Sequence, residues 1–259
     1  MPCALVLLIS LSVAAQDFSL GVKGGGLVNW AAFGDKSQKD TFGTRPTFGY
    51  TAGFQIGFPM KENFRFLTEV AFTRKGRSLT FREGEWQNRS VYHFAEANML
   101  LRKSFRFEFA DNVPADWFFS LGPEVAYWFS SRGKIIQDPP GTPYTAIFNK
   151  PPESIPNDPA NPKMFYNNIN RWLFSLVVGV GFKAPLKGNQ SIATELRFVS
   201  GHTFLGSRNS TSLQILGFDD TLLTNLKSIN LVATYTFDFN VQKSRKGKST
   251  LNKKLKKSR

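Results

Sequence analysis

The chain has 259 residues, 26 of them Phe, a net charge of +14 and a mean hydropathy of −0.23. This length allows one large all-β domain or two small ones, and no internal apolar run reaches the roughly 18 residues of a membrane-spanning helix. The single cysteine, Cys3, excludes an intramolecular disulfide and a cysteine metal cluster.

Two segments at the ends differ from the rest. An apolar run from Cys3 ends in Val13-Ala14-Ala15, which is typical of a cleavage site, so we predict a signal peptide over residues 1–15. The run lacks the usual basic start, which suggests a true start codon further upstream; a short buried helix is the alternative. At the other end, residues 241–259 hold nine Lys or Arg and no acid, leaving only +5 for all other residues. We predict a basic, disordered tail there.

Strand-like segments alternate with polar breaks over residues 16–240, the predicted exported domain. Successive side chains of an extended strand face opposite sides, and the segment 172–183 places its large apolar residues opposite Ser175, Gly179 and Gly181. Eight strands are predicted in this way: 18–27, 48–58, 66–81, 91–105, 117–131, 172–183, 192–198 and 229–239.

One strand pattern occurs three times: a large apolar residue, two spacers, Glu, Val or Leu, a spacer and an aromatic residue. It places Glu69, Glu124 and Glu195 opposite an apolar face. A repeated strand that is apolar on one side and carries a lone Glu on the other indicates a closed sheet whose exterior meets lipid. Only helices and closed barrels satisfy every backbone group in lipid.

The breaks between strands also alternate. Those at Pro59–Asn63 and Pro185–Gln190 are tight, whereas the longest runs from Arg132 to Asn170. Short turns on one side and long loops on the other are typical of outer-membrane proteins. We predict an all-β fold, an eight-stranded antiparallel transmembrane β-barrel with short periplasmic turns and long extracellular loops. A secreted lipocalin-like barrel with an apolar lumen is the alternative.

Charged residues are expected inside this barrel. Eight strands leave an interior that side chains fill, and buried carboxylates either pair or become protonated. We predict a salt-bridge network that plugs the lumen, with a narrow polar conduit or proton-sensitive gate as the alternative. Its expected members are Lys23, Glu69, Glu96, Arg102, Glu124, Lys183, Glu195 and Arg197.

The two histidines, His93 and His202, are the candidates for acid–base chemistry. Alternation points both outward at the loop side, His93 with Ser90 three residues away. A lipid-modifying barrel enzyme would place a Ser-His-acid set there. We interpret both as rim histidines among interfacial aromatic residues. No Gly-x-Ser-x-Gly elbow and no metal-ligand spacing occurs, so we expect no catalysis, no cofactor and no metal.

Local features also point to a membrane boundary. The five tryptophans fall near strand ends, as in an aromatic girdle, although strict alternation turns Trp128 inward. Pro123 interrupts its strand and is expected to mark a bulge.

The chain contains the motifs Gly21-Val22-Lys23-Gly24-Gly25, the Thr-Glu-Val strand, Leu121-Gly122-Pro123-Glu124 and Tyr235-Thr236-Phe237. Through these motifs, the stretch from Phe18 to Asn240 resembles the PorT-like outer-membrane β-barrel proteins of the Bacteroidetes. The resemblance implies a Gram-negative, porin-like barrel; some members belong to secretion and gliding machinery, and most are small barrels of unknown task. The basic tail departs from the pattern.

We therefore expect a structural or interaction role, with outer-membrane lipid as a partner. The alternatives are a component of a secretion or gliding complex, whose periplasmic partner would bind the basic tail by charge, and a narrow channel or lipid-modifying barrel enzyme. Nucleic-acid binding is not expected of an exported chain.

Overall fold

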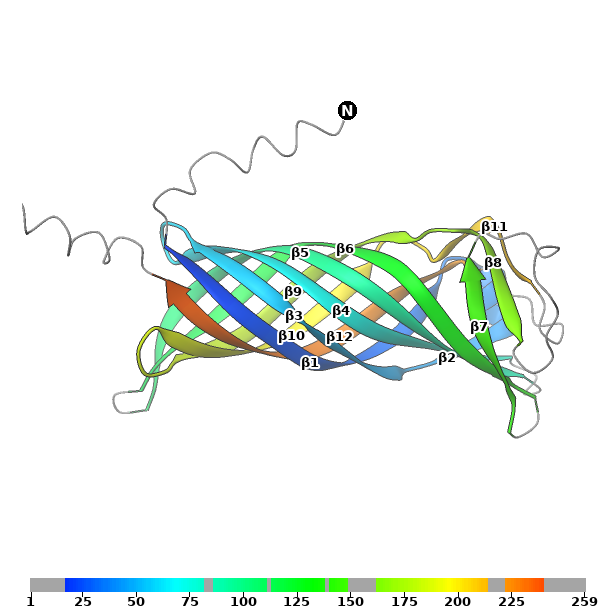
Figure 1. The fold of residues 1–259 in the computed structure, drawn as a ribbon, viewed down its shortest axis with the longest axis horizontal. Helices are drawn as coiled ribbons and strands as arrows, with labels where there is room; N and C mark the ends of the chain where they lie inside the picture. The colour runs from blue at the N-terminus through cyan, green and yellow to red at the C-terminus, as the bar shows by residue number, and fades with distance from the viewer. Residues whose placement is uncertain are drawn as a thin grey trace, which may run out of the picture.

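The computed structural model describes residues 17–81, 86–110, 113–137, 140–148, 162–213 and 222–239; the predicted signal peptide and basic tail lie outside these ranges. Eight long antiparallel strands form the body of the protein (Figure 1). They are β1 (Phe18–Phe33), β3 (Thr47–Pro59), β4 (Phe64–Phe81), β5 (Gln87–Ala110), β6 (Val113–Ile136), β9 (Trp172–Pro185), β10 (Gln190–Gly201) and β12 (Thr224–Phe239).

The eight strands close into a ring. Each pairs with its neighbours in the chain, β6 pairs with β9, and β1 closes the ring on β12. Following paired residues once around, from Lys183 on β9, leads back to Leu173 on the same strand, a shift of ten residues. In an eight-stranded barrel such a stagger tilts the strands by roughly 40°. Figure 1 shows the strands inclined to the long axis of the barrel. The predicted all-β barrel of eight strands is confirmed.

The two ends of the barrel differ, as predicted. The turn end, at the left of Figure 1, holds the start of β1, the end of β12 and the tight turns. In the turn after β3, Glu62 and Asn63 take positive φ values of 57° and 62°, and the Met60 amide bonds to the Phe64 carbonyl at 2.8 Å.

The opposite end, the loop end, carries further short elements. They are α2 (Lys36–Thr41), β2 (Phe42–Arg45), β7 (Thr142–Phe148), β8 (Lys163–Ile169) and β11 (Gly206–Leu213). The break predicted over residues 132–170 is therefore partly wrong. β6 continues beyond the barrel to Ile136, and its free edge pairs with β7, which pairs with β8.

Apolar side chains cover the outside of the barrel. The exposed large hydrophobic residues recur at every second position, as in Phe174, Leu176 and Val180 of β9, while their neighbours point inward. The interior has two parts. Buried charged and polar residues fill the middle, and a cluster of aromatic and aliphatic residues around Trp128 fills the loop-end half.

The bulge expected at Pro123 lies elsewhere. The pairing register of β5 and β6 is the same on both sides of Pro123, whereas it shifts where His93 pairs with Ser130 and Phe94 with Trp128. Phe129 is thus the extra residue. A bulge places an additional residue on one strand, and here it leaves both Phe129 and Ser130 off the inward face while Trp128 is fully buried.

The tryptophans occupy several environments. Trp117 stacks on Phe105 at 4.5 Å near the turn end, and Trp172 packs on Tyr127 at 4.8 Å toward the loop end. Trp128 lies inside the barrel, and Trp86 packs against the loop-end core. Trp30 is half-buried. Trp117 and Trp172 are thus the two that lie exposed on the outer surface.

Candidate functional site

The middle of the barrel contains a chain of alternating charges. Arg197 on β10 binds both carboxylate oxygens of Glu69 on β4, at 2.6 and 2.7 Å, and reaches Glu195 at 2.8 Å. Lys23 extends this chain at one end, 2.6 Å from Glu69, and Arg102 extends it at the other, 2.8 Å from Glu195. Paired, charge-assisted hydrogen bonds of this kind are stronger than neutral ones, so the chain ties four strands together across the lumen.

Neutral side chains complete this group, which we call the Arg197 network. Asn98 donates to Glu69 at 3.2 Å, and the hydroxyl of Ser120 donates to Glu195. The guanidinium of Arg102 also lies over the ring of Phe118, 3.8 Å from its centroid, in a cation–π contact. Three cations and two carboxylates give this network one net positive charge.

A second group, the Lys75 network, carries the opposite charge. Lys75 lies 2.6 Å from Glu96 and 3.6 Å from Glu124, and Thr73 donates to Glu96 at 2.6 Å. One cation and two carboxylates leave one net negative charge, which balances the Arg197 network. All four carboxylates therefore have a cationic partner, as burial away from water demands.

Seven of the eight predicted lumen residues lie buried in these networks; Lys183 does not. It stands at the turn-end mouth, 3.6 Å from Asp238. The alternation of side chains predicts that Lys183 faces the lumen, but it does not predict how far along the barrel axis this side chain lies. The sequence reasoning missed Lys75 and buried Arg77, although both lie an even number of positions from Glu69 on β4 and thus share its face.

The loop-end half of the interior is apolar. Trp128 packs on Tyr92 at 4.9 Å and on Phe148 at 4.9 Å, and the cluster includes Tyr144 and Tyr166. The Tyr144 hydroxyl donates a hydrogen bond to Asn88 Oδ1 at 2.8 Å and shares another, also of 2.8 Å, with the hydroxyl of Ser90. Burial raises the pKa of Tyr144 to about 12. A tightly packed aromatic layer thus covers the charged networks on this side.

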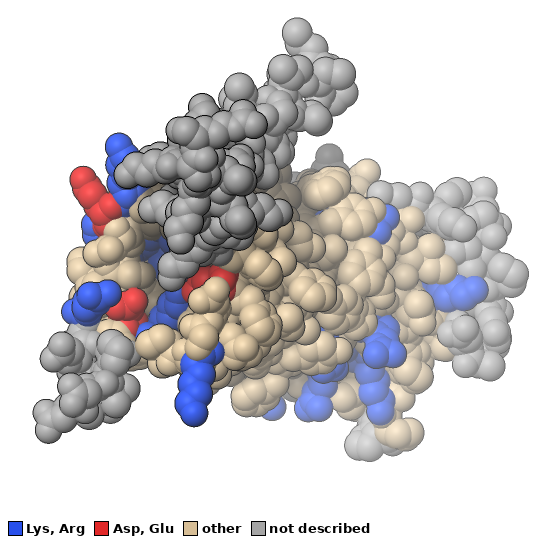
Figure 2. All heavy atoms as spheres, turned by 60° about the vertical axis from the view of Figure 1, so that its left-hand side comes forward, with Lys and Arg blue, Asp and Glu red and all other residues tan. Residues whose placement is uncertain are grey.

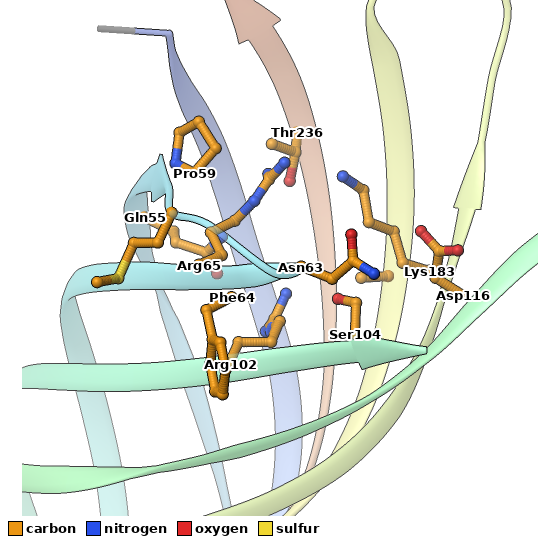
Figure 3. Close-up of a pocket in the computed structure, with 12 residues that line it drawn as sticks. Gln55, Pro59, Asn63, Phe64, Arg65, Arg102, Ser104, Asp116, Lys183 and Thr236 are labelled. Atoms are coloured by element: carbon orange, nitrogen blue, oxygen red, sulfur yellow. The ribbon is translucent and has the colours of Figure 1, made fainter. Parts of the chain in front are cut away.

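The turn-end mouth is a small polar cavity of about 210 Å³. Figure 3 shows Arg65, Arg102 and Lys183 projecting from different strands around this opening, with Asp116 beside Lys183. Arg65 also pairs with Asp238 at 3.2 Å. Arg102 belongs both to this lining and to the Arg197 network, so the cavity ends where the ion pairs begin.

The histidines are not arranged as a catalytic set. His93 stacks between Phe72 and Phe129 on the outer surface, and its Nδ1 lies 3.2 Å from Ser130. The expected neighbour Ser90 instead points inward to Tyr144, because it stands an odd number of positions from His93. The charged groups near His93 are Arg74 and Arg132. Both are cations, so neither can orient the imidazole ring as the acid of a catalytic triad would.

His202 follows β10 at the loop end. Its backbone amide bonds to the Phe174 carbonyl at 2.9 Å, and Thr203 accepts a hydrogen bond from the Phe174 amide. Within the described ranges, no group of three or more His, Cys, Asp or Glu could hold a metal ion. The described residues also include no helix that is long and apolar enough to cross a membrane.

A closed antiparallel sheet that is apolar outside and charged inside defines a membrane-spanning β-barrel, since closure satisfies every backbone group in lipid. The family described as "Outer membrane protein beta-barrel domain" matches residues 14–203, and the chain belongs to this family. The protein is accordingly an outer-membrane protein, with its turn end in the periplasm and its loop end outside the cell.

Solved structures of other small barrels are similar to this chain. Neisserial surface protein A (NspA) is 12% identical, with a TM-score of 0.42, over 86% of this chain and 97% of that one. OprG from Pseudomonas aeruginosa is 11% identical, with a TM-score of 0.47, over 87% and 97%. Ail, the attachment invasion locus protein of Yersinia pestis, is 12% identical, with a TM-score of 0.34, over 86% and 99%. A comparison with curated proteins finds no match.

Proposed function

We propose that this barrel is a sealed, non-catalytic scaffold of the outer membrane, with a structural or interaction role. The observation that carries the proposal is the Arg197 network, which joins β1, β4, β5 and β10 across the lumen by ion pairs of 2.6–2.8 Å. Opening a conduit would separate these charges, and breaking a buried pair costs about 3–5 kcal/mol. The aromatic layer around Trp128 adds a second seal.

Planar-bilayer recording tests the seal. The wild-type barrel should show no stable unit conductance, and an Arg197→Ser/Trp128→Ala variant, which weakens both seals, should show frequent openings. A Lys61→Gln variant in the exposed turn serves as the control and should stay silent. Reproducible unit conductance of the wild-type barrel would refute the sealed scaffold and favour the narrow channel.

A second candidate role rests on the direction in which the chain leaves the barrel. β12 ends at Phe239 at the turn end, and nine basic residues follow in 241–259. We propose that these basic residues bind an acidic periplasmic protein or lipid. The PorT resemblance suggests that such a protein would belong to a bacterial secretion or gliding complex. Deletion of 241–259 should remove periplasmic proteins crosslinked to the wild-type chain, while the heat-modifiable mobility of the folded barrel persists. Unchanged crosslinked partners would contradict this role.

A further inference from the structure

Five basic side chains lie on the outer face of the barrel near its loop end: Arg45, Arg74, Arg89, Arg132 and Lys134. The pairing register aligns three of them, because Arg45 and Arg89 both pair with Ser78, and Arg89 pairs in turn with Lys134. Residues paired directly across a sheet share a face. The five residues, from β2, β4, β5 and β6, are named here the basic belt.

The basic belt has no acidic counterpart in the part of the chain that the structure describes. No ion pair there involves any of its members, in contrast to the balanced interior. Arg89 and Lys134 even stand directly opposite each other, an arrangement that destabilises a sheet by like-charge repulsion. A binding partner with negative charge would turn this repulsion into attraction.

Two adjoining grooves run through the basic belt. One, of about 340 Å³, is lined by Arg45, Arg74 and Arg89; the other, of about 350 Å³, is lined by Arg89, Arg132 and Lys134. Both grooves include Arg89 and Val91, so they meet there. The planar guanidinium group of arginine can bind two phosphate oxygens at once. Each groove is lined by at least two arginine side chains.

The surface beside the basic belt identifies the kind of anion. Arg74 pairs with Tyr50 on one side and His93 on the other, and this row continues into the exposed aromatic cluster of Phe72 and Phe129. Phe48, which is 81% exposed, lines the first groove. On the face in view in Figure 2, basic side chains occur at the near turn end and toward the receding loop end, whereas acidic ones are seen only at the near end. The basic belt thus stands where acyl chains give way to head groups.

We propose that the basic belt is a binding site for a phosphorylated glycolipid of the outer leaflet, with phosphates in the two grooves and acyl chains on the aromatic surface below. A soluble polyanion could satisfy the charges but would leave Phe48 and the aromatic cluster in water. The loop end faces outward, so the lipid must come from the outer leaflet. This inference does not depend on whether the lumen is sealed.

The test uses the full-length folded barrel in phosphatidylcholine nanodiscs, titrated with bis-phosphorylated lipid A, with the same lipid after phosphate removal, and with heparin. Lipid A should bind at least ten-fold more tightly than its dephosphorylated form. Arg89→Gln/Arg132→Gln should abolish this preference. The matched control, Lys61→Gln/Lys187→Gln, removes two exposed charges at the turn end and should retain it.

Equal affinity for the two lipids, or equal loss in the control variant, would overturn the proposal. Tighter binding of heparin than of lipid A would also overturn it and assign the basic belt to a soluble polyanion. Heat-modifiable mobility verifies that each variant folds. If the double variant does not fold, Arg89→Gln alone, which relieves the repulsion with Lys134, should reduce the preference at least three-fold, and an unchanged preference would count against the site.

Discussion

Replacing Glu69 by Gln tests the energetics of the interior most directly. Among the described residues, Glu69 is the only carboxylate within 4.0 Å of the Lys23 ammonium, and it binds Arg197 through both oxygens. The substitution keeps the volume but leaves Lys23 buried without an anion. Because an uncompensated buried charge is the costly outcome, we expect the free energy of unfolding to fall by about 3–5 kcal/mol.

A second substitution separates charge imbalance from lost packing. In the Glu69→Gln background, Lys23→Met removes the stranded cation, while Arg197 keeps Glu195 as its partner. The double variant should therefore be more stable than Glu69→Gln alone, with a coupling energy of about 1–3 kcal/mol.

Urea unfolding in lipid vesicles, followed by tryptophan fluorescence and by heat-modifiable mobility, measures both values. Glu62→Gln, in an exposed turn, is the control and should stay within about 0.5 kcal/mol of wild type. If Glu69→Gln cost less than about 1 kcal/mol, or if Lys23→Met lowered stability further in that background, the buried ion pairs would not be what stabilises the barrel.

Three more predictions concern separate parts of the molecule. A Cβ at Gly179 would overlap the carboxylate and hydroxyl that meet beside it, so Gly179→Ala should cost about 1–3 kcal/mol of unfolding free energy, whereas Gly26→Ala, which meets nothing within 4 Å, should cost little. The pKa of Tyr144 is about 12 in the folded protein and about 10 in the unfolded chain. The neutral Tyr144 hydroxyl therefore makes its full contribution to the free energy of unfolding below pH 10, and this contribution is lost as the pH rises through 12. Urea titrations should therefore show stability falling by up to about 1.4 kcal/mol per pH unit in this window, less steeply in Tyr144→Phe. His93→Ala and His202→Ala should leave membrane lipid profiles unchanged by mass spectrometry; altered profiles would revive the lipid-modifying enzyme.

Period-two alternation made most of the barrel predictable. It is a local property of the chain, so the strands, their outward faces and the inward direction of Glu69 and Lys23 could be derived without any knowledge of pairing. The alternation of short and long breaks then fixed the topology. The inward direction of Trp128 followed from the same rule.

Depth and long-range pairing could not be derived in this way. Lys183 faces inward but lies at the mouth, because its height depends on the ten-residue stagger around the ring. The bulge at Phe129 depends on the partner strand, so Pro123 was a poor indicator. The strands β7 and β8 could not be predicted, because β7 pairs with an edge of β6 that is free only beyond the barrel, and β8 pairs with β7.

The ion pairs of the interior also constrain biogenesis. Arg197 and Glu69 are 128 positions apart, and β1 can close the ring only on β12, the final described strand. A chain that ended before β10 would lack both Arg197 and Glu195, so Arg102 would lose its carboxylate partner and the ring could not close, which makes insertion of a partial barrel unfavourable. Stable insertion therefore requires the whole set of barrel strands, because the interior charges are neutralised only when distant strands meet.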